Sequence, residues 1–132
     1  MSATVIDGRD AARRVRERVA EGCAAFAARH GRKPGLVGIQ VGEDPASEIY
    51  QRNKAQQAEE AGMAVERMKL PEGTTQAEMD ALLDRLAADD AVDGMLVQLP
   101  VPDPLTELAI AARIEPTKDV DGFSPVNIGH LV

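Results

Sequence analysis

Residues 36–54, LVGIQVGEDPASEIYQRNK, contain the signals of a buried strand, a turn and a helix start in succession, and this order indicates the class of fold. Residues 36–41 form a short apolar run between two glycines, which is typical of a strand buried in a parallel sheet. Asp44 then supplies a side-chain oxygen that can cap free helix N–H groups, and Pro45 suits the first turn of a helix. We therefore predict a strand over 36–41 and a helix over about 46–61.

Apolar patterns on both sides of this stretch continue the alternation of helices and strands. Val15, Val19 and Cys23 recur at helical spacing, which predicts a helix with one apolar stripe and Cys23 in the core. Thr75 followed by Glu78 is a capping box that predicts the start of another helix. Such alternation implies right-handed crossovers, so we predict an α/β fold: a three-layer α/β/α domain with a mainly parallel sheet. The predicted helices are 11–30, 75–88 and 103–114, and the further predicted strands are 63–70 and 94–99.

The composition limits the class of protein. The 132 residues, 44% hydrophobic and 28% charged, suit one globular domain. A balance of 15 basic and 22 acidic residues gives a net charge of −7, which argues against nucleic acid or an anionic membrane as partner. Cys23 is the single cysteine, so we expect no internal disulfide and a reducing, cytoplasmic setting. The sequence contains neither a signal-peptide core nor a run of about 18 apolar residues, so no membrane span is expected.

The helix that follows the first strand carries two side chains suited to chemistry. Ligands of open α/β sheets bind at the carboxyl ends of the strands, where this helix begins. Tyr50 and Lys54 are four residues apart and share a helix face, so an aromatic ring and an amine could meet a planar ligand together. The same spacing is compatible with a half-buried packing tyrosine and a solvated surface lysine.

Polar residues near the other strand ends also leave two interpretations open. Gln98 interrupts an apolar run, and its amide needs hydrogen-bond partners whether it is a core residue or reaches a ligand cleft. Asp119 and Asp121 alternate in an extended segment, and with Gly122 they also suit a plain Asx-type turn. The two histidines, at positions 30 and 130, are far apart and have no metal-ligand neighbours, so no metal site is expected.

Three blocks of sequence together resemble a known enzyme family. They are VGEDPASEIYQRNK (41–54), DGMLVQLPVP (93–102) and PTKDVDGFSPVNIGHL (116–131). In this order they are similar to signature blocks of the bifunctional methylenetetrahydrofolate dehydrogenase/cyclohydrolase family, and the resemblance extends across essentially the whole chain. It departs at Ser124 and His130, which stand where family members often have His and Arg.

The resemblance implies a folate site in which individual residues have specific roles. Lys54 matches the family's catalytic lysine, and Gln98 matches the glutamine that hydrogen-bonds it. Tyr50 matches the tyrosine that stacks on the folate, and Asp121 matches the aspartate that accepts N–H groups of the pterin. We expect Lys54 to be partly buried, because a dry setting favours the neutral amine needed for proton transfer. The further lining residues that the resemblance implies are Val97, Leu99 and Pro100.

The resemblance also implies how the domains and activities are divided. Residues 1–118 are expected to be the folate-binding catalytic domain, and residues 119–132 a rim segment leading to an NAD(P)-binding, Rossmann-type domain that is absent from this chain. No glycine-rich phosphate-loop pattern occurs in the sequence. The family oxidises 5,10-methylenetetrahydrofolate to the 5,10-methenyl compound and hydrolyses that to 10-formyltetrahydrofolate. The intact protein is expected to use NADP, to need no metal and to be a homodimer, whereas the dehydrogenase step is not expected from these 132 residues.

Two other hypotheses compete with this one. The first is a non-catalytic folate- or small-ligand-binding α/β module, which would share the pocket but not the turnover. The second is an acidic response-regulator-like interaction domain. It fits less well, because the sequence does not combine an acidic pair after the first strand with a lysine at a late strand.

Overall fold

The computed structural model of the protein describes residues 2–132 and has a parallel three-stranded sheet at its centre. Strand β1 (Gly35–Val41) lies between β2 (Ala64–Leu70) and β3 (Gly94–Val97). Leu36 is paired with Val65 on one side and with Gly94 on the other. The middle position explains why residues 37–41 are all buried and why the strand is mostly apolar, with Gln40 as its polar exception.

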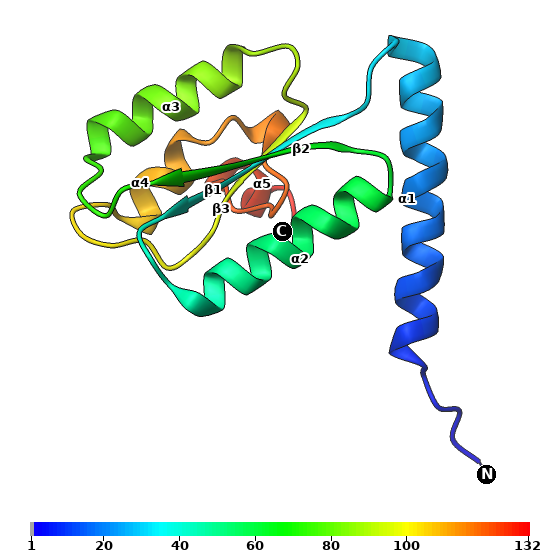
Figure 1. Cartoon of the computed structure of the whole chain (residues 1–132). Helices are drawn as coiled ribbons and strands as arrows, with labels where there is room; N and C mark the ends of the chain where they lie inside the picture. Colours follow the sequence, from blue (N-terminus) through cyan, green and yellow to red (C-terminus); the bar gives the residue numbers. More distant parts are fainter. Residues whose placement is uncertain (1) are drawn as a thin grey trace.

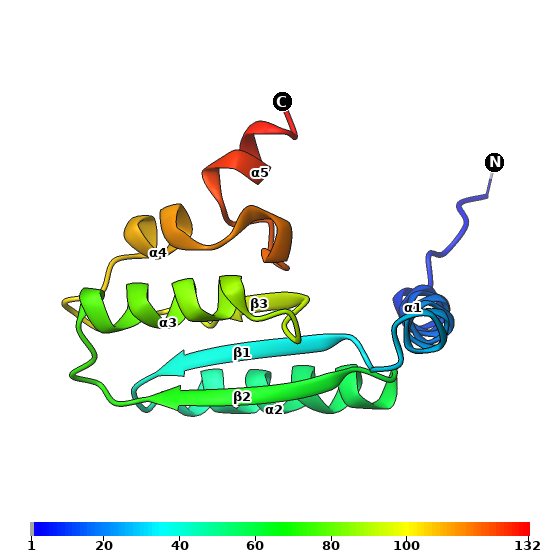
Figure 2. The same cartoon turned by 90° about the horizontal axis from the view of Figure 1, so that it is seen from above.

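Helices cover both faces of the sheet, as predicted. Figure 2 shows α2 (Pro45–Glu60) on one face, and α3 (Gln76–Ala88) and α4 (Glu107–Arg113) on the other. The chain then continues through a 3-10 turn, η1 (Pro116–Lys118), to the short helix α5 (Pro125–Gly129). The predicted three-layer α/β/α arrangement and the parallel sheet are therefore confirmed.

The apolar core lies between the sheet and the α3–α4 layer. Met79 and Leu83 of α3 are fully buried there against Ile39 and Met95 of the sheet. The capping box predicted at the start of α3 is present: the Thr75 hydroxyl accepts from the Glu78 N–H, and the Glu78 carboxylate accepts from the Thr75 N–H. The core also includes Val37, Val41, Leu82, Leu86, Val92, Val97, Leu105, Ile110 and Ile114.

The first helix does not lie over the sheet. Helix α1 (Gly8–His30) stands beside the end of the sheet, apart from both layers (Figures 1 and 2). Of its predicted apolar stripe only Cys23 is buried, where it faces Gly62 just beyond α2, while Val15 is 55% exposed. Cys23 is thus buried as predicted, but most of the stripe is uncovered, because the spacing of apolar residues gives the direction of a helix face but not whether another element covers it.

Two predicted element boundaries were also wrong. Strand β3 ends at Val97 rather than at residue 99, because Pro100 and Pro102 lack the N–H groups that would continue a ladder. The helix predicted from residue 103 begins at Glu107, since it is the Thr106 hydroxyl that accepts the Ala109 N–H at 3.2 Å. The Asp-Pro pair before it belongs instead to a turn.

Candidate functional site

Helix α2 presents three distinct sides, and its start is built by a side-chain cap. The Asp44 carboxylate accepts the Ser47 N–H at 3.2 Å and the Ser47 hydroxyl at 2.5 Å. These bonds, with the Ser47 hydroxyl contributing most, lower the pKa of Asp44 below its usual value. Ser47 and Gln51 lie on the buried side of the helix, which sits against β1. Lys54 lies on one flank of this buried face, and Glu48 lies on the other.

One flank of α2 brings Lys54 to Gln98. The Lys54 Nζ atom donates to Gln98 Oε1 at 3.2 Å, which joins α2 to the residue after β3 across a separation of 44 positions. Gln98 is itself held at two points, because its backbone N–H donates to Ile39 O at 2.7 Å and its Nε2 donates to Leu99 O at 3.2 Å. A neutral amide oxygen fixed in this way can orient the amine without supplying a counter-charge.

The surroundings of this pair are more open than the sequence analysis expected. Lys54 is exposed rather than partly buried, and Tyr50, one helical turn earlier on the same face, is 63% exposed. Both side chains are therefore accessible to a ligand from solution. The expected partial burial of Lys54 is therefore wrong for the described residues.

The three expected lining residues differ in their positions. Val97 is 5% exposed and belongs to the core on the α3 side of the sheet, opposite to the side that Gln98 faces. Its side chain is therefore not brought together with Lys54. Leu99 is half-buried and Pro100 is exposed, and both follow Gln98 directly along the strand end. Because side chains alternate along a strand, Val97 and the next residue, Gln98, face opposite sides of the sheet, and this difference can be predicted from the sequence.

The segment that carries Asp121 lies along the free edge of β3. Asp119 forms an isolated parallel bridge with Met95, and the Val120 N–H donates to Met95 O at 3.3 Å. Asp121 follows two residues later and is exposed. The structure shows no Asx-type hydrogen bond at either aspartate within residues 2–132; instead the Asp119 carboxylate accepts the Ser124 N–H, five residues further on, at 2.7 Å and the Asn127 side-chain amide at 2.9 Å.

The electrostatic state of Asp119 follows from these bonds. Burial by itself raises the pKa of this carboxyl, but hydrogen bonds from the Ser124 N–H, the Asn127 amide and the N–H groups of Phe123 and Gly122 outweigh it and lower the pKa below the usual value. The charged Asp119 side chain therefore stabilises the turn formed by the residues that follow it. From the sequence Asp119 was expected only as a possible turn residue; the signal for these partners was an Asp followed five positions later by Ser124, which caps the short helix α5.

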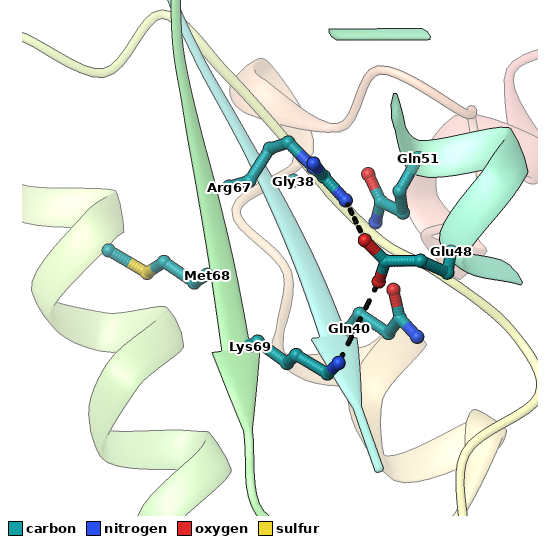
Figure 3. Close-up of a pocket in the computed structure, with 7 residues that line it drawn as sticks. All are labelled: Gly38, Gln40, Glu48, Gln51, Arg67, Met68 and Lys69. Carbon is teal, nitrogen blue, oxygen red and sulfur yellow. Dashed lines mark hydrogen bonds and ion pairs between the residues drawn. The ribbon is translucent and has the colours of Figure 1, made fainter. Parts of the chain in front are cut away.

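The other flank of α2 borders a small polar pocket that the sequence analysis also missed. Figure 3 shows Glu48 between Arg67 and Lys69, with N–O distances of 2.7 and 3.8 Å, in a pocket of about 210 Å³. Its floor contains the buried amides of Gln40 and Gln51, the second of which donates to Ile39 O at 3.4 Å. A glutamine inside the apolar run of a central strand was the signal that could have located it.

The charges of this pocket are satisfied within the protein. The hydrogen bond from Arg67 lowers the pKa of Glu48, and Lys69 also pairs with Glu43 at 3.0 Å. These contacts stabilise the α2–β2 flank, so the Lys54–Gln98 side remains the candidate site. In residues 2–132, no cluster of three or more His, Cys, Asp or Glu side chains is placed to hold a metal ion. Nor does any helix in this range have the length and apolar character to cross a membrane.

Comparison with known proteins gives a consistent result. The family described as tetrahydrofolate dehydrogenase/cyclohydrolase, catalytic domain, matches residues 6–121. The chain is 52% identical over 129 residues to the bifunctional protein FolD of Caulobacter sp. (strain K31), covering 98% of this chain and 43% of that protein. It is 53% identical over 128 residues to FolD 2 of Paracoccus denitrificans, covering 97% of this chain and 42% of that protein. The chain thus spans less than half the length of these relatives.

Solved structures agree with the sequence relatives. The bifunctional FolD methylenetetrahydrofolate dehydrogenase/cyclohydrolase of Campylobacter jejuni superposes with a TM-score of 0.92 at 39% identity, covering 98% of this chain and 46% of that one. The Trypanosoma brucei enzyme, solved in complex with NADP cofactor and an inhibitor, gives a TM-score of 0.88 at 35% identity, covering 99% of this chain and 45% of that one. The likeness therefore extends over almost all of this chain and over one part of each relative.

Proposed function

This chain belongs to the tetrahydrofolate dehydrogenase/cyclohydrolase family, and from that membership we propose that it binds reduced folates and hydrolyses 5,10-methenyltetrahydrofolate to 10-formyltetrahydrofolate. The observation that carries the proposal is the hydrogen bond from Lys54 Nζ to Gln98 Oε1, which holds a proton-carrying amine beside the carboxyl end of β3.

The proposed reaction needs proton transfer at two points. Water adds to the methenyl carbon and loses a proton to leave a hydroxyl group; the C–N5 bond then breaks as N5 gains a proton and the hydroxyl loses its own, which leaves the formyl group on N10 and releases one proton overall. Lys54 is the group in this site that can accept and return a proton, and Gln98 keeps its Nζ atom in position. A carboxylate in place of Gln98 would instead hold the amine in its charged form.

The remaining residues are proposed to hold the flat heterocycle. Tyr50 is the single tyrosine of the sequence, and its exposed ring can stack on the aromatic part of folate. Asp121 is proposed to accept two adjacent N–H groups of the pterin, which a carboxylate can do with its two oxygens. Leu99 and Pro100 would border the ring, whereas Val97 could reach it only through its backbone.

The proposal does not assign the hydride transfer to residues 2–132. In the full-length protein, the proposal includes NADP-dependent oxidation of 5,10-methylenetetrahydrofolate, supported by the NADP complex of the Trypanosoma relative. The turn after β1 does not fit the pyrophosphate of that cofactor, because it carries the carboxylates of Glu43 and Asp44. We also propose that the full-length protein is a cytoplasmic homodimer, as its resemblance to the family implies.

Replacement of the amine tests the proposal. In Lys54→Met we expect tetrahydrofolate binding to persist and the enzymatic hydrolysis of methenyltetrahydrofolate, followed by its absorbance, to fall by roughly 10²–10⁴-fold. Arg52→Met is the matched control, because Arg52 is another exposed cation on α2. Equal hydrolysis by the wild type and Lys54→Met would contradict the catalytic assignment, and binding without hydrolysis in the wild type would favour a non-catalytic folate-binding module.

A further inference from the structure

The side chain of Lys118 closes the carboxyl-terminal end of α3. Its Nζ atom donates to the carbonyl oxygens of Leu86, Ala87 and Asp89 at 3.0, 2.9 and 2.9 Å, so all three of its donors are used. The last carbonyls of a helix have no partner within the helix and carry its partial negative charge. The ammonium group of Lys118, 29–32 positions further along the chain, therefore caps α3 and ties the end of η1 to it.

The next residue ties the same segment in another direction. The Asp119 carboxylate accepts from the Ser124 N–H and from the Asn127 amide, and that amide also donates to Pro116 O at 2.9 Å. The backbone at Asp119 is paired with Met95 of β3. Two consecutive side chains thus point to different partners, one to α3 and the other to α5, while the backbone between them is held at the sheet edge.

Asp121 has no comparable attachment of its own. It is exposed, and within residues 2–132 its carboxylate takes part in no hydrogen bond or ion pair. Gly122, which follows it, has a φ of +64°, in the left-handed region that glycine adopts readily at turns. The position of the Asp121 carboxylate is consequently set by the anchors on either side of it, most directly by those at residues 118 and 119.

We propose that Lys118 and Asp119 are positioning residues that hold residues 119–122 at the edge of β3 so that Asp121 meets the pterin of a bound folate. This inference rests on the proposed function for the role of Asp121. Neither Lys118 nor Asp119 touches the substrate or the reacting atoms. Loss of either anchor should therefore weaken substrate binding and raise KM, while kcat at saturating substrate stays close to that of the wild type.

A double-mutant cycle tests the inference. Lys118→Met is expected to raise the Kd for tetrahydrofolate roughly tenfold, since the ion-assisted cap is lost. Lys118→Arg keeps the cation and should restore most of the affinity. When Asp121→Asn is already present, Lys118→Met should have no further effect on the Kd. Lys69→Met is the matched control, because Lys69 pairs with Glu43 on the far flank of α2.

A measurement without ligand separates this inference from the proposed function. Amide hydrogen exchange of residues 119–124 should be faster in Lys118→Met and in Asp119→Ala than in the wild type, with the exchange of β1 unchanged. Unchanged exchange in this segment, or an equal loss of affinity with and without Asp121→Asn, would overturn the positioning role. If the wild type fails to bind tetrahydrofolate, the proposed function fails, while faster exchange in the variants still supports the two anchors.

Discussion

Gln98 illustrates how much depends on a single neutral side chain. Its amide oxygen accepts from Lys54 without providing a counter-charge. We predict that Gln98→Glu, which is nearly the same size, lowers methenyltetrahydrofolate hydrolysis by roughly 10²-fold because the new carboxylate keeps the ammonium charged. Tetrahydrofolate affinity, measured by calorimetric titration, should change little, and Gln98→Ala serves as the comparison without a charge. Wild-type rates in Gln98→Glu would show that proton transfer does not involve Lys54.

Gly38 makes room for a buried amide. A Cβ atom added at this position would lie 2.7 Å from Gln51 Oε1, so the glutamine would have to move within the core. We predict that Gly38→Ala lowers the free energy of unfolding by about 1–3 kcal/mol in urea titrations. Gly73→Ala is the control, because nothing lies within 4 Å of its added Cβ. The loss should be smaller when Gly38→Ala is made in a Gln51→Ala background, and an undiminished loss would show that the clash is not the cause.

At the scale of elements, the connection from α1 to β1 is fastened to the start of β3 by Arg32 and Asp93. The Asp93 carboxylate accepts from Arg32 Nη1 at 2.6 Å and from the Gly35 N–H at 2.8 Å. The Arg32 hydrogen bond, followed by the Gly35 N–H, lowers the pKa of Asp93 from its usual 3.8 despite some desolvation. A carboxyl group whose folded pKa is lowered stabilises the fold above its unfolded pKa, and this stabilisation is lost as the pH falls through the folded pKa.

Acid titration of an Asp93 variant tests this link. At pH 7 we expect Asp93→Asn to lower the free energy of unfolding by about 1 kcal/mol, a modest value because the pair is partly exposed and screened by solvent. The difference from the wild type should shrink as the pH drops below about 4, because the wild-type carboxyl then becomes protonated. Asp90→Asn makes the same change of charge on a neighbouring exposed residue and should have little effect. A difference that stays constant from pH 7 to pH 3 would contradict the ion-pair explanation.

The boundaries of the elements divide into those that local chemistry predicts and those that it does not. The starts of α2 and α3 were predictable because Asp44 and Thr75 cap them with their own side chains. The start of α4 was not, because the prediction placed it at the Asp-Pro pair, whereas Thr106 caps the helix in the structure. The predicted end of β3 was too far along the chain, because apolar side chains continue after the hydrogen-bond ladder of the strand has ended.

At the scale of the whole molecule, stability should depend on the core between the sheet and α3. Leu83 is fully buried there, whereas Leu108 on α4 is 84% exposed. We predict that Leu83→Ala lowers the free energy of unfolding by about 2–5 kcal/mol. Leu108→Ala, which deletes the same atoms, should stay within about 0.5 kcal/mol of the wild type. Similar losses in both variants by chemical denaturation would mean that α4 packs differently from the arrangement described.

Local sequence was enough to predict the alternation of helices and strands, the caps of α2 and α3, and the position of Tyr50 and Lys54 on one helix face. Each of these depends on residues within a few positions of one another. The family resemblance paired Gln98 with Lys54, but the contact itself, the cap that Lys118 forms on α3 and the uncovered part of the α1 stripe are known only from the folded chain. Those outcomes join residues about 30 to 44 positions apart, or depend on whether another element is present, and no local pattern of side chains encodes which distant surfaces meet.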